Sequence, residues 1–238
     1  MLFRRVAKHV SDQNWLAVGV DFLIVVLGLI VGLQVNNWND QRKIENAFKD
    51  AQTRLIAEHQ SNLDAASAFV STVETTVVPL RAAITDLRAC DASPDALQRV
   101  TLGMNLIRGT QSIEFRKTAL EAITDNDAFL SLLTEQDREA LKEFHRQLTQ
   151  TQETLNWLEE YPFSAPIGAH PAVQYSDLVT SGLMPGDKAR SIGPSQPIDV
   201  LCQDPVFMRS FYLWERTARF QVIRGRQIIE ALEKMLGS

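Results

Sequence analysis

The sequence lacks the short motifs that mark most enzyme active sites. No glycine-rich phosphate loop, no Gly-x-Ser-x-Gly nucleophile elbow and no His-Glu-x-x-His zinc motif occurs in its 238 residues. The four histidines are far apart, and none has acidic or cysteine neighbours at a metal-ligand spacing. We therefore predict that the protein is not an enzyme and that it holds no cofactor or metal.

Basic residues are also in the minority. The chain has 24 lysines and arginines against 29 aspartates and glutamates, which gives a net charge of −5. Because phosphate binding draws on clustered basic side chains, this balance argues against nucleic acid as a partner. Hydrophobic residues make up 45% of the chain, an ordinary fraction for a folded protein, so disorder over most of its length is not expected.

The most informative feature that is present is an apolar segment near the N-terminus. Residues 16–35 contain 15 apolar side chains and three glycines, with only two polar interruptions. Twenty helical residues span about 30 Å, the thickness of the hydrocarbon core of a bilayer. Trp15 and Trp38 bracket the segment about 35 Å apart, where interfacial aromatic belts lie. We predict a transmembrane helix over residues 15–38.

Two alternatives exist for this segment, a buried core helix and a cleaved signal peptide. A buried core helix rarely lacks a polar stripe over about five turns. A signal peptide needs small residues at its cleavage site, and residues 34–37 offer none. The membrane-spanning interpretation is therefore preferred.

The flanking charges indicate the orientation. Arg4, Arg5 and Lys8 precede the segment in a short tail, whereas the basic residues that follow it have acidic neighbours. The count of basic residues alone does not decide the orientation, because Arg42, Lys43 and Lys49 follow the segment. The short basic tail, with few acidic neighbours, favours the N-terminus in the cytoplasm and residues 39–238 in the periplasm. Residues 1–14 are then a cytoplasmic amphipathic tail, whose three basic side chains can contact anionic headgroups.

Three residues within the span are candidates for a functional role. Gly28 and Gly32 form a small-xxx-small pair on one helical face, which would let a second helix approach closely. Asp21 places a carboxylate inside the headgroup boundary, where an ionised group is costly unless it is paired or protonated. The alternatives are a chance pair of glycines and a carboxylate that reaches the interface.

This region resembles a known family. The N-terminal signature of an uncharacterised bacterial family of single-span proteins, a domain of unknown function, is similar to Gln13-Asn14-Trp15, Asp21-Phe22, Ile24-Val25-Val26, Gly28, Gly32, Gln34-Val35 and Asn37-Trp38-Asn39. The resemblance is specific over roughly residues 12–45 and loose beyond them. It implies a bacterial inner-membrane setting. Because the family has no assigned reaction, it implies no catalytic residues.

Residues 39–238 have the periodicity of packed helices. Apolar or small residues recur at steps of mostly three and four from Ile44 to Leu87, with one gap at His59. This pattern predicts a long helix that ends near Ala89 and has a kink or break at Pro79. Cap signals and periodicity predict further helices over residues 94–108, 113–123, 127–133, 135–160 and from 205 onward.

The expected fold class is therefore all-α, with a transmembrane helix followed by an antiparallel helical bundle. Residues 162–204 are the exception, because six prolines and four glycines without a sustained period predict a long irregular loop. Such a loop either shapes a binding surface or is a plain connector. The aromatic residues and histidine in or beside it are Tyr161, Phe163, His170 and Tyr175.

The two cysteines, Cys90 and Cys202, fit either two free thiols or one bridge. If the first long helix leaves the membrane and the last one returns toward it, the two cysteines meet at the distal end of the bundle. We therefore expect a disulfide, which would stabilise the fold by roughly 4 kcal/mol.

The last helix is locally basic on an acidic chain. Its Arg224 and Arg226 either pair with acidic residues of the first long helix or contact anionic lipid or an acidic partner.

These features predict a non-enzymatic interaction or scaffold protein of a bacterial inner membrane. Its expected partners are the lipid bilayer and either a second copy of the chain or another membrane protein. The alternative is an extracytoplasmic module that binds a small molecule and acts through a partner. A cleft lined by convergent polar groups would favour the ligand, and a flat apolar patch would favour the protein partner.

Overall fold

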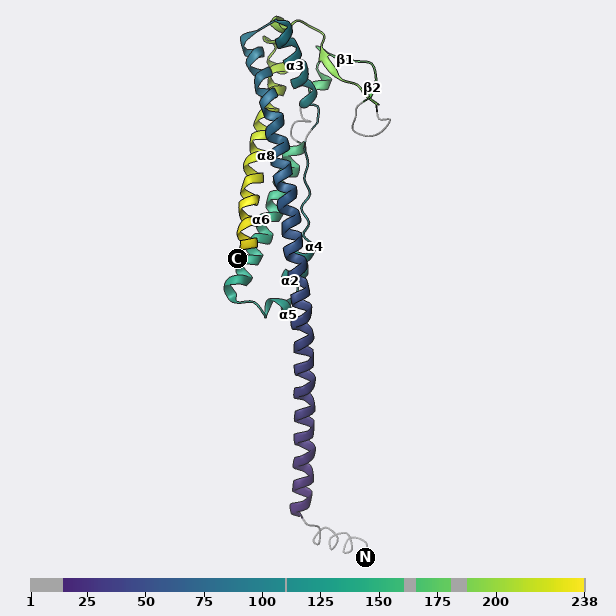
Figure 1. The fold of residues 1–238 in the computed structure, drawn as a ribbon, viewed down its shortest axis with the longest axis vertical. Helices are drawn as coiled ribbons and strands as arrows, with labels where there is room; N and C mark the ends of the chain where they lie inside the picture. Colours follow the sequence, from purple (N-terminus) through teal and green to yellow (C-terminus); the bar gives the residue numbers. More distant parts are fainter. Residues whose placement is uncertain (1–14, 110, 161–165, 181–187, 238) are drawn as a thin grey trace, which may run out of the picture.

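The computed structural model describes residues 15–109, 111–160, 166–180 and 188–237 (Figure 1). The chain is mainly α-helical, as predicted. Its elements are α2 (Trp15–Ala89), α3 (Pro94–Leu106), α4 (Thr118–Thr124), α5 (Asp127–Leu130), α6 (Glu135–Glu160), the 3-10 turn η2 (Ile167–Ala169), β1 (Val173–Tyr175), β2 (Val179–Thr180), β3 (Lys188–Ala189), β4 (Ile192–Pro194), α7 (Ile198–Leu201) and α8 (Pro205–Gly237).

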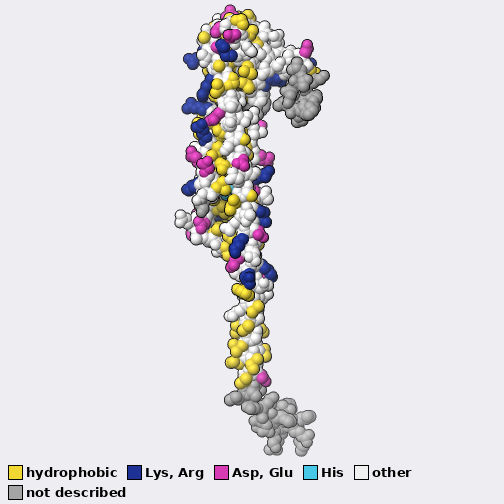
Figure 2. Space-filling model, viewed as in Figure 1, with side chains coloured by type: hydrophobic (Ala, Val, Ile, Leu, Met, Phe, Trp, Pro, Cys, Tyr) yellow, Lys and Arg dark blue, Asp and Glu magenta, His cyan; other side chains and the backbone are white. Residues whose placement is uncertain are grey.

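Helix α2 has 75 residues, which make about 110 Å of continuous helix. Its N-terminal part is exposed, and its C-terminal part packs against other helices. Its N-terminal part projects alone from the molecule, and every side chain from Gly19 to Lys43 is exposed (Figures 1 and 2). Phe48 is the first residue of α2 described as buried, and we call the described residues between 48 and 237 the packed region. By length and composition, α2 is the one described helix that could cross a membrane.

Helix α2 is continuous through Pro79, so of the predicted kink or break the break is wrong. A proline removes one backbone N–H and crowds the preceding turn, which costs several kcal/mol in an isolated helix. Here the flanking Val77 and Leu80 are buried in the hydrophobic core, and their packing keeps this turn helical.

Helix α8 runs antiparallel to α2 and packs along it (Figure 1). The ion pairs Arg81–Glu215, at 2.8 Å, and Glu74–Arg226, at 2.5 Å, join the two helices on the outside. Helices α2 and α8 approach closely at Gly225, where an added Cβ atom would collide with the Val70 side chain. Helix α6 packs on α8, and α3 and α4 pack on α2.

The predicted helix over residues 113–123 is only partly correct. Residues 111–117 have no regular secondary structure and run as an extended trace along the molecule (Figure 1), and α4 begins at Thr118. This extended segment pairs with none of the described strands. Its backbone groups instead bond to side chains of neighbouring helices, so contacts from distant parts of the chain override the local helical pattern.

The predicted irregular loop, 162–204, contains more regular structure than expected. β1 pairs antiparallel with β4, β2 pairs antiparallel with β3, and α7 precedes the last helix. His170 lies 3.2 Å from the Asp204 carboxylate and connects this segment to the start of α8. Asp204 also accepts backbone N–H bonds from Phe207 and Val206. These bonds, chiefly that from Phe207, and the nearby His170 hold the pKa of Asp204 below its ordinary value.

Candidate functional site

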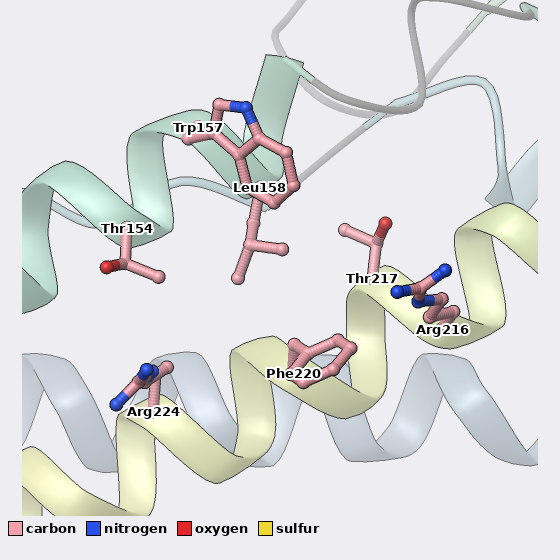
Figure 3. Close-up of a pocket in the computed structure, with 7 residues that line it drawn as sticks. All are labelled: Thr154, Trp157, Leu158, Arg216, Thr217, Phe220 and Arg224. Carbon is pink, nitrogen blue, oxygen red and sulfur yellow. The ribbon is translucent and has the colours of Figure 1, made fainter.

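Helices α6 and α8 enclose a groove on the outside of the packed region (Figure 3). A cavity of about 240 Å³ lies between Thr154, Trp157 and Leu158 of α6 and Arg216, Thr217, Phe220 and Arg224 of α8. A second cavity of about 270 Å³ shares Thr154 and Arg224 with the first and continues toward the C-terminus of α8. The second cavity is lined mainly by amide and hydroxyl side chains, so the groove has an apolar half and a polar half.

The apolar half of the groove has a buried floor and an exposed aromatic mouth. Trp157 and Leu158 extend from α6 toward α8, and Phe220 and Thr217 extend from α8 toward α6 (Figure 3). Leu158 and Thr217 are buried, whereas Trp157 is 58% exposed and Phe220 is 44% exposed. The Thr217 hydroxyl is buried beneath the groove and has no hydrogen-bond partner among the described residues.

Two arginines lie on either side of Phe220 (Figure 3). The Arg216 guanidinium lies 5.8 Å from the centre of the Phe220 ring, and Arg224 donates a hydrogen bond to the Gln227 side chain at 3.0 Å. Neither forms an ion pair with a described residue. The groove therefore presents apolar surface next to cationic groups, which suits an apolar or aromatic group that carries an acid.

A polar cluster interrupts the core face of α2 at Glu58, His59 and Asn62. The Asn62 amide donates to the Arg116 carbonyl at 2.8 Å and accepts from the Arg116 N–H at 2.9 Å. The Glu58 carboxylate accepts the N–H groups of Ala119 and Leu120, in the first turn of α4. Glu58 therefore caps α4 from another helix, since the N-cap residue Lys117 makes no side-chain capping bond.

Side chains of α6 and α8 hold the rest of the extended segment before α4. Gln152 accepts from the Phe115 N–H and donates to the Ile113 carbonyl. The Trp214 indole donates to the Gly109 carbonyl, and Gln221 donates to the Gln111 carbonyl. These four bonds tie backbone groups of residues 109–115 to two helices, so the side chains that make them are structural.

His59 is the least satisfied member of the polar cluster. Its side chain is 3% exposed, and its ring packs edge-on against Phe144 with centroids 4.8 Å apart. In the part of the chain that the structure describes, its Nε2 has no hydrogen-bond partner. Burial lowers the pKa of His59 below its ordinary 6.5, against the opposing effect of the Glu58 carboxylate. Charging this ring would place an unpaired cation in the core.

This position predicts a pH dependence of stability. The pKa of His59 is lower in the folded state than in the unfolded state. The stability that its neutral ring contributes is therefore fully present above pH 6.5. It is lost as the pH falls through the folded-state pKa, with a slope of at most about 1.4 kcal/mol per pH unit. His59→Phe should remove this slope from denaturant unfolding curves recorded between pH 7.5 and 5. His145→Gln is the control, and an unchanged slope in His59→Phe would contradict the assignment.

Several residues predicted from the sequence lie in the exposed part of α2. Trp15 begins the helix, and Asp21 is exposed within the apolar segment. Trp38 is exposed, with the Arg42 guanidinium 4.9 Å from its ring centroid. A Cβ atom at Gly28 or Gly32 would meet nothing within 4 Å, so this face is open for a second helix, and that contact stays a prediction.

The other predicted residues have definite partners or lie outside the described residues. Cys90 and Cys202 form a disulfide with their Cα atoms 5.3 Å apart. Arg226 forms an ion pair with Glu74 of α2. This is the first of the two alternatives predicted for it from the sequence, pairing with an acidic residue of the first long helix. A lipid contact or acidic-partner contact of Arg224 stays a prediction. Arg4, Arg5, Lys8, Tyr161 and Phe163 lie outside the described residues.

No family model, curated protein or solved structure matches this chain. Within the described ranges, no group of three or more His, Cys, Asp or Glu side chains could hold a metal ion. The groove and the exposed part of α2 therefore carry the functional interpretation.

The sequence did not single out the groove residues Trp157, Arg216 and Phe220. Trp157 and Phe220 are large apolar residues that lie outside the buried stripes of their helices. This position off the stripe was the one feature of the sequence that could have pointed to the groove. The polar cluster had a clearer signal, because the apolar pattern of α2 has its one gap at His59.

Proposed function

We propose that this chain is a single-span protein of a bacterial inner membrane, with a cytoplasmic N-terminus and a periplasmic helical bundle. The observation that carries this proposal is the exposure of the apolar segment, which belongs to the same helix as the packed region. Apolar surface in water costs about 25 cal/mol per Å², and a bilayer would remove that cost.

Two further observations support this location. The Cys90–Cys202 disulfide favours an oxidising compartment, because cytosolic thiols are kept reduced. The resemblance of residues 12–45 to a family of single-span bacterial proteins favours the same membrane.

In this proposal the protein acts as an interaction or scaffold protein without catalysis. The helical turns between Val35 and Phe48 place the packed region about 20 Å beyond the apolar segment. A continuous helix sets that distance rigidly, which suits a domain that presents a surface to a second copy or to another membrane protein. The groove between α6 and α8 is the candidate surface.

The groove also favours a second candidate function, the binding of a small apolar acid. Its cavity is small, Arg216 and Arg224 flank its aromatic wall, and no described residue bonds to the Thr217 hydroxyl beneath it. A bound ligand would then act through a partner protein. Native mass spectrometry of the chain extracted from membranes would show the added mass of the bound ligand.

Membrane fractionation tests the anchor. The full chain should stay in the pellet after a high-pH carbonate wash and dissolve only with detergent, whereas a chain that starts at residue 39 should be soluble. Recovery of the full chain in the supernatant without detergent would contradict the proposal. Protease added to spheroplasts should cleave the packed region if it is periplasmic, and crosslinking in native membranes with mass spectrometry would identify partners.

A further inference from the structure

The outer face of α6 beside the groove carries an aromatic ring between two acids. Glu153 lies four residues before Trp157, and Glu160 lies three residues after it, so the three side chains share one face of the helix. All three are exposed. Neither glutamate forms an ion pair with a described residue.

The outer face of α8 has the same pattern with the opposite charge. Arg216 and Arg224 lie four residues before and after Phe220, all three side chains are exposed, and the arginines flank the ring (Figure 3). A stripe of this kind on an acidic chain is complementary to a partner that brings carboxylates and an apolar surface.

The acidic and basic side chains lie at matching levels along the groove. The residues that line it place Trp157 beside Arg216 and Phe220, and Thr154 beside Arg224, so α6 and α8 are antiparallel. Glu160, one turn past Trp157, is therefore level with Arg216, and Glu153 is level with Arg224. The two acids are about 10.5 Å apart along the axis and the two bases about 12 Å.

The proposed anchor restricts how two copies can meet, and the inference rests on it. Two chains inserted in the same direction can form a closed dimer only about an axis along the membrane normal. Helix α8 runs along α2 and α6 packs on α8, so both lie nearly parallel to that axis (Figure 1). A rotation about it keeps every residue at its own level, and brings α6 of one copy against α8 of the other.

We propose that the α6–α8 face binds a second copy of this chain. Trp157 of each copy packs on Phe220 of the other and closes the mouth of the groove. Glu160 pairs with Arg216 of the second copy, and Glu153 pairs with Arg224. The face is self-complementary, because the two-fold rotation places the acidic residues of each copy opposite the basic residues of the other.

Charge reversal in the full chain, reconstituted in lipid nanodiscs, tests the proposal. The wild type should be a dimer by mass photometry. Arg216→Glu with Arg224→Glu, and separately Glu153→Arg with Glu160→Arg, should each weaken the dimer by about 100-fold or more, because like charges then face each other. Mixing the two double variants should restore a dimer that contains one copy of each.

Matched variants separate this face from other surfaces. Arg54→Glu with Arg88→Glu makes the same charge change on exposed positions of α2 and should leave the dimer intact. Gly28→Leu with Gly32→Leu tests the apolar helix, and loss of the dimer in that variant alone would overturn the proposal. A monomeric wild type, with or without a bound apolar acid, would overturn it too, as would a failure of the mixed variants to pair.

Flotation of the same samples with vesicles reports the anchor independently. A chain that floats but remains monomeric contradicts the dimer alone, whereas a chain that does not float contradicts the anchor. Each variant must retain the Cys90–Cys202 disulfide and the helical circular-dichroism signal of the wild type, so that the loss of the dimer is not a loss of the fold.

Discussion

Replacement of both cysteines by serine is expected to lower the free energy of unfolding by about 4 to 5 kcal/mol. Cys90 and Cys202 are 112 residues apart in sequence, so their bridge closes nearly half of the chain into one loop. Reduction releases that loop in the unfolded state and raises its entropy. Guanidinium unfolding of the full chain in mild detergent, followed by circular dichroism, measures the change.

The backbone at Cys90 offers a sharper version of this test. Cys90 has a positive φ of 49°, and it ends α2 with bonds from its own N–H to the Leu87 carbonyl and from the Asp91 N–H to the Asp86 carbonyl. Glycine adopts this conformation with less strain than serine does. Cys90→Gly with Cys202→Ser should therefore lose about 1 kcal/mol less than the serine pair.

Equal unfolding midpoints in the wild type and the serine pair would contradict this prediction. The tip of the molecule would then be held by its other contacts, chiefly the bidentate pair of Arg99 with Asp86 and the Ser93 cap of α3. Reduction of the wild type with a thiol is the internal control, because it should reproduce the loss without a change of sequence.

Helix ends were predictable where one side chain caps them locally. Ser93 accepts the Ala96 N–H and α3 begins at Pro94. Thr134 accepts the Asp137 N–H and α6 begins at Glu135, while Asp204 caps α8. These interactions lie within three residues of sequence, so the sequence alone contains them. The mainly helical class followed from the apolar periodicity for the same reason.

Features that depend on distant residues were not predictable in this way. Pro79 predicts a kink or break, but the buried neighbours of this proline keep α2 continuous, so no break occurs there. The segment before α4 has a helical pattern, but it is extended because side chains of α2, α6 and α8 supply its hydrogen bonds. The α6–α8 groove likewise depends on how two helices align, which no local pattern encodes.

The gap in the apolar pattern of α2 is the exception, since it was visible in the sequence and has a structural cause. A polar side chain on a core face is costly unless it finds a partner. At this gap Glu58 and Asn62 find backbone groups of the extended segment and of α4. Such a gap in a long amphipathic helix therefore indicates where a segment without regular structure will dock.

Asn62→Leu is expected to lower the free energy of unfolding by about 2 to 4 kcal/mol. Asn62 is 1% exposed, and its amide satisfies both the N–H and the carbonyl of Arg116. A leucine fills a similar volume and favours the helix, but it leaves two polar groups without partners, at about 1 to 3 kcal/mol for each.

Hydrogen exchange locates the effect of Asn62→Leu. The Arg116 amide and the amides in the first turn of α4 should exchange faster than in the wild type. The exchange rates of the α8 amides should change only as far as the global free energy of unfolding changes. Gln60→Leu is the matched control, because Gln60 is exposed and bonds only to Asp64 on the surface of the same helix; its effect should stay within about 0.5 kcal/mol. Equal effects of the two substitutions would show that α2 holds the extended segment through apolar contacts rather than through these hydrogen bonds.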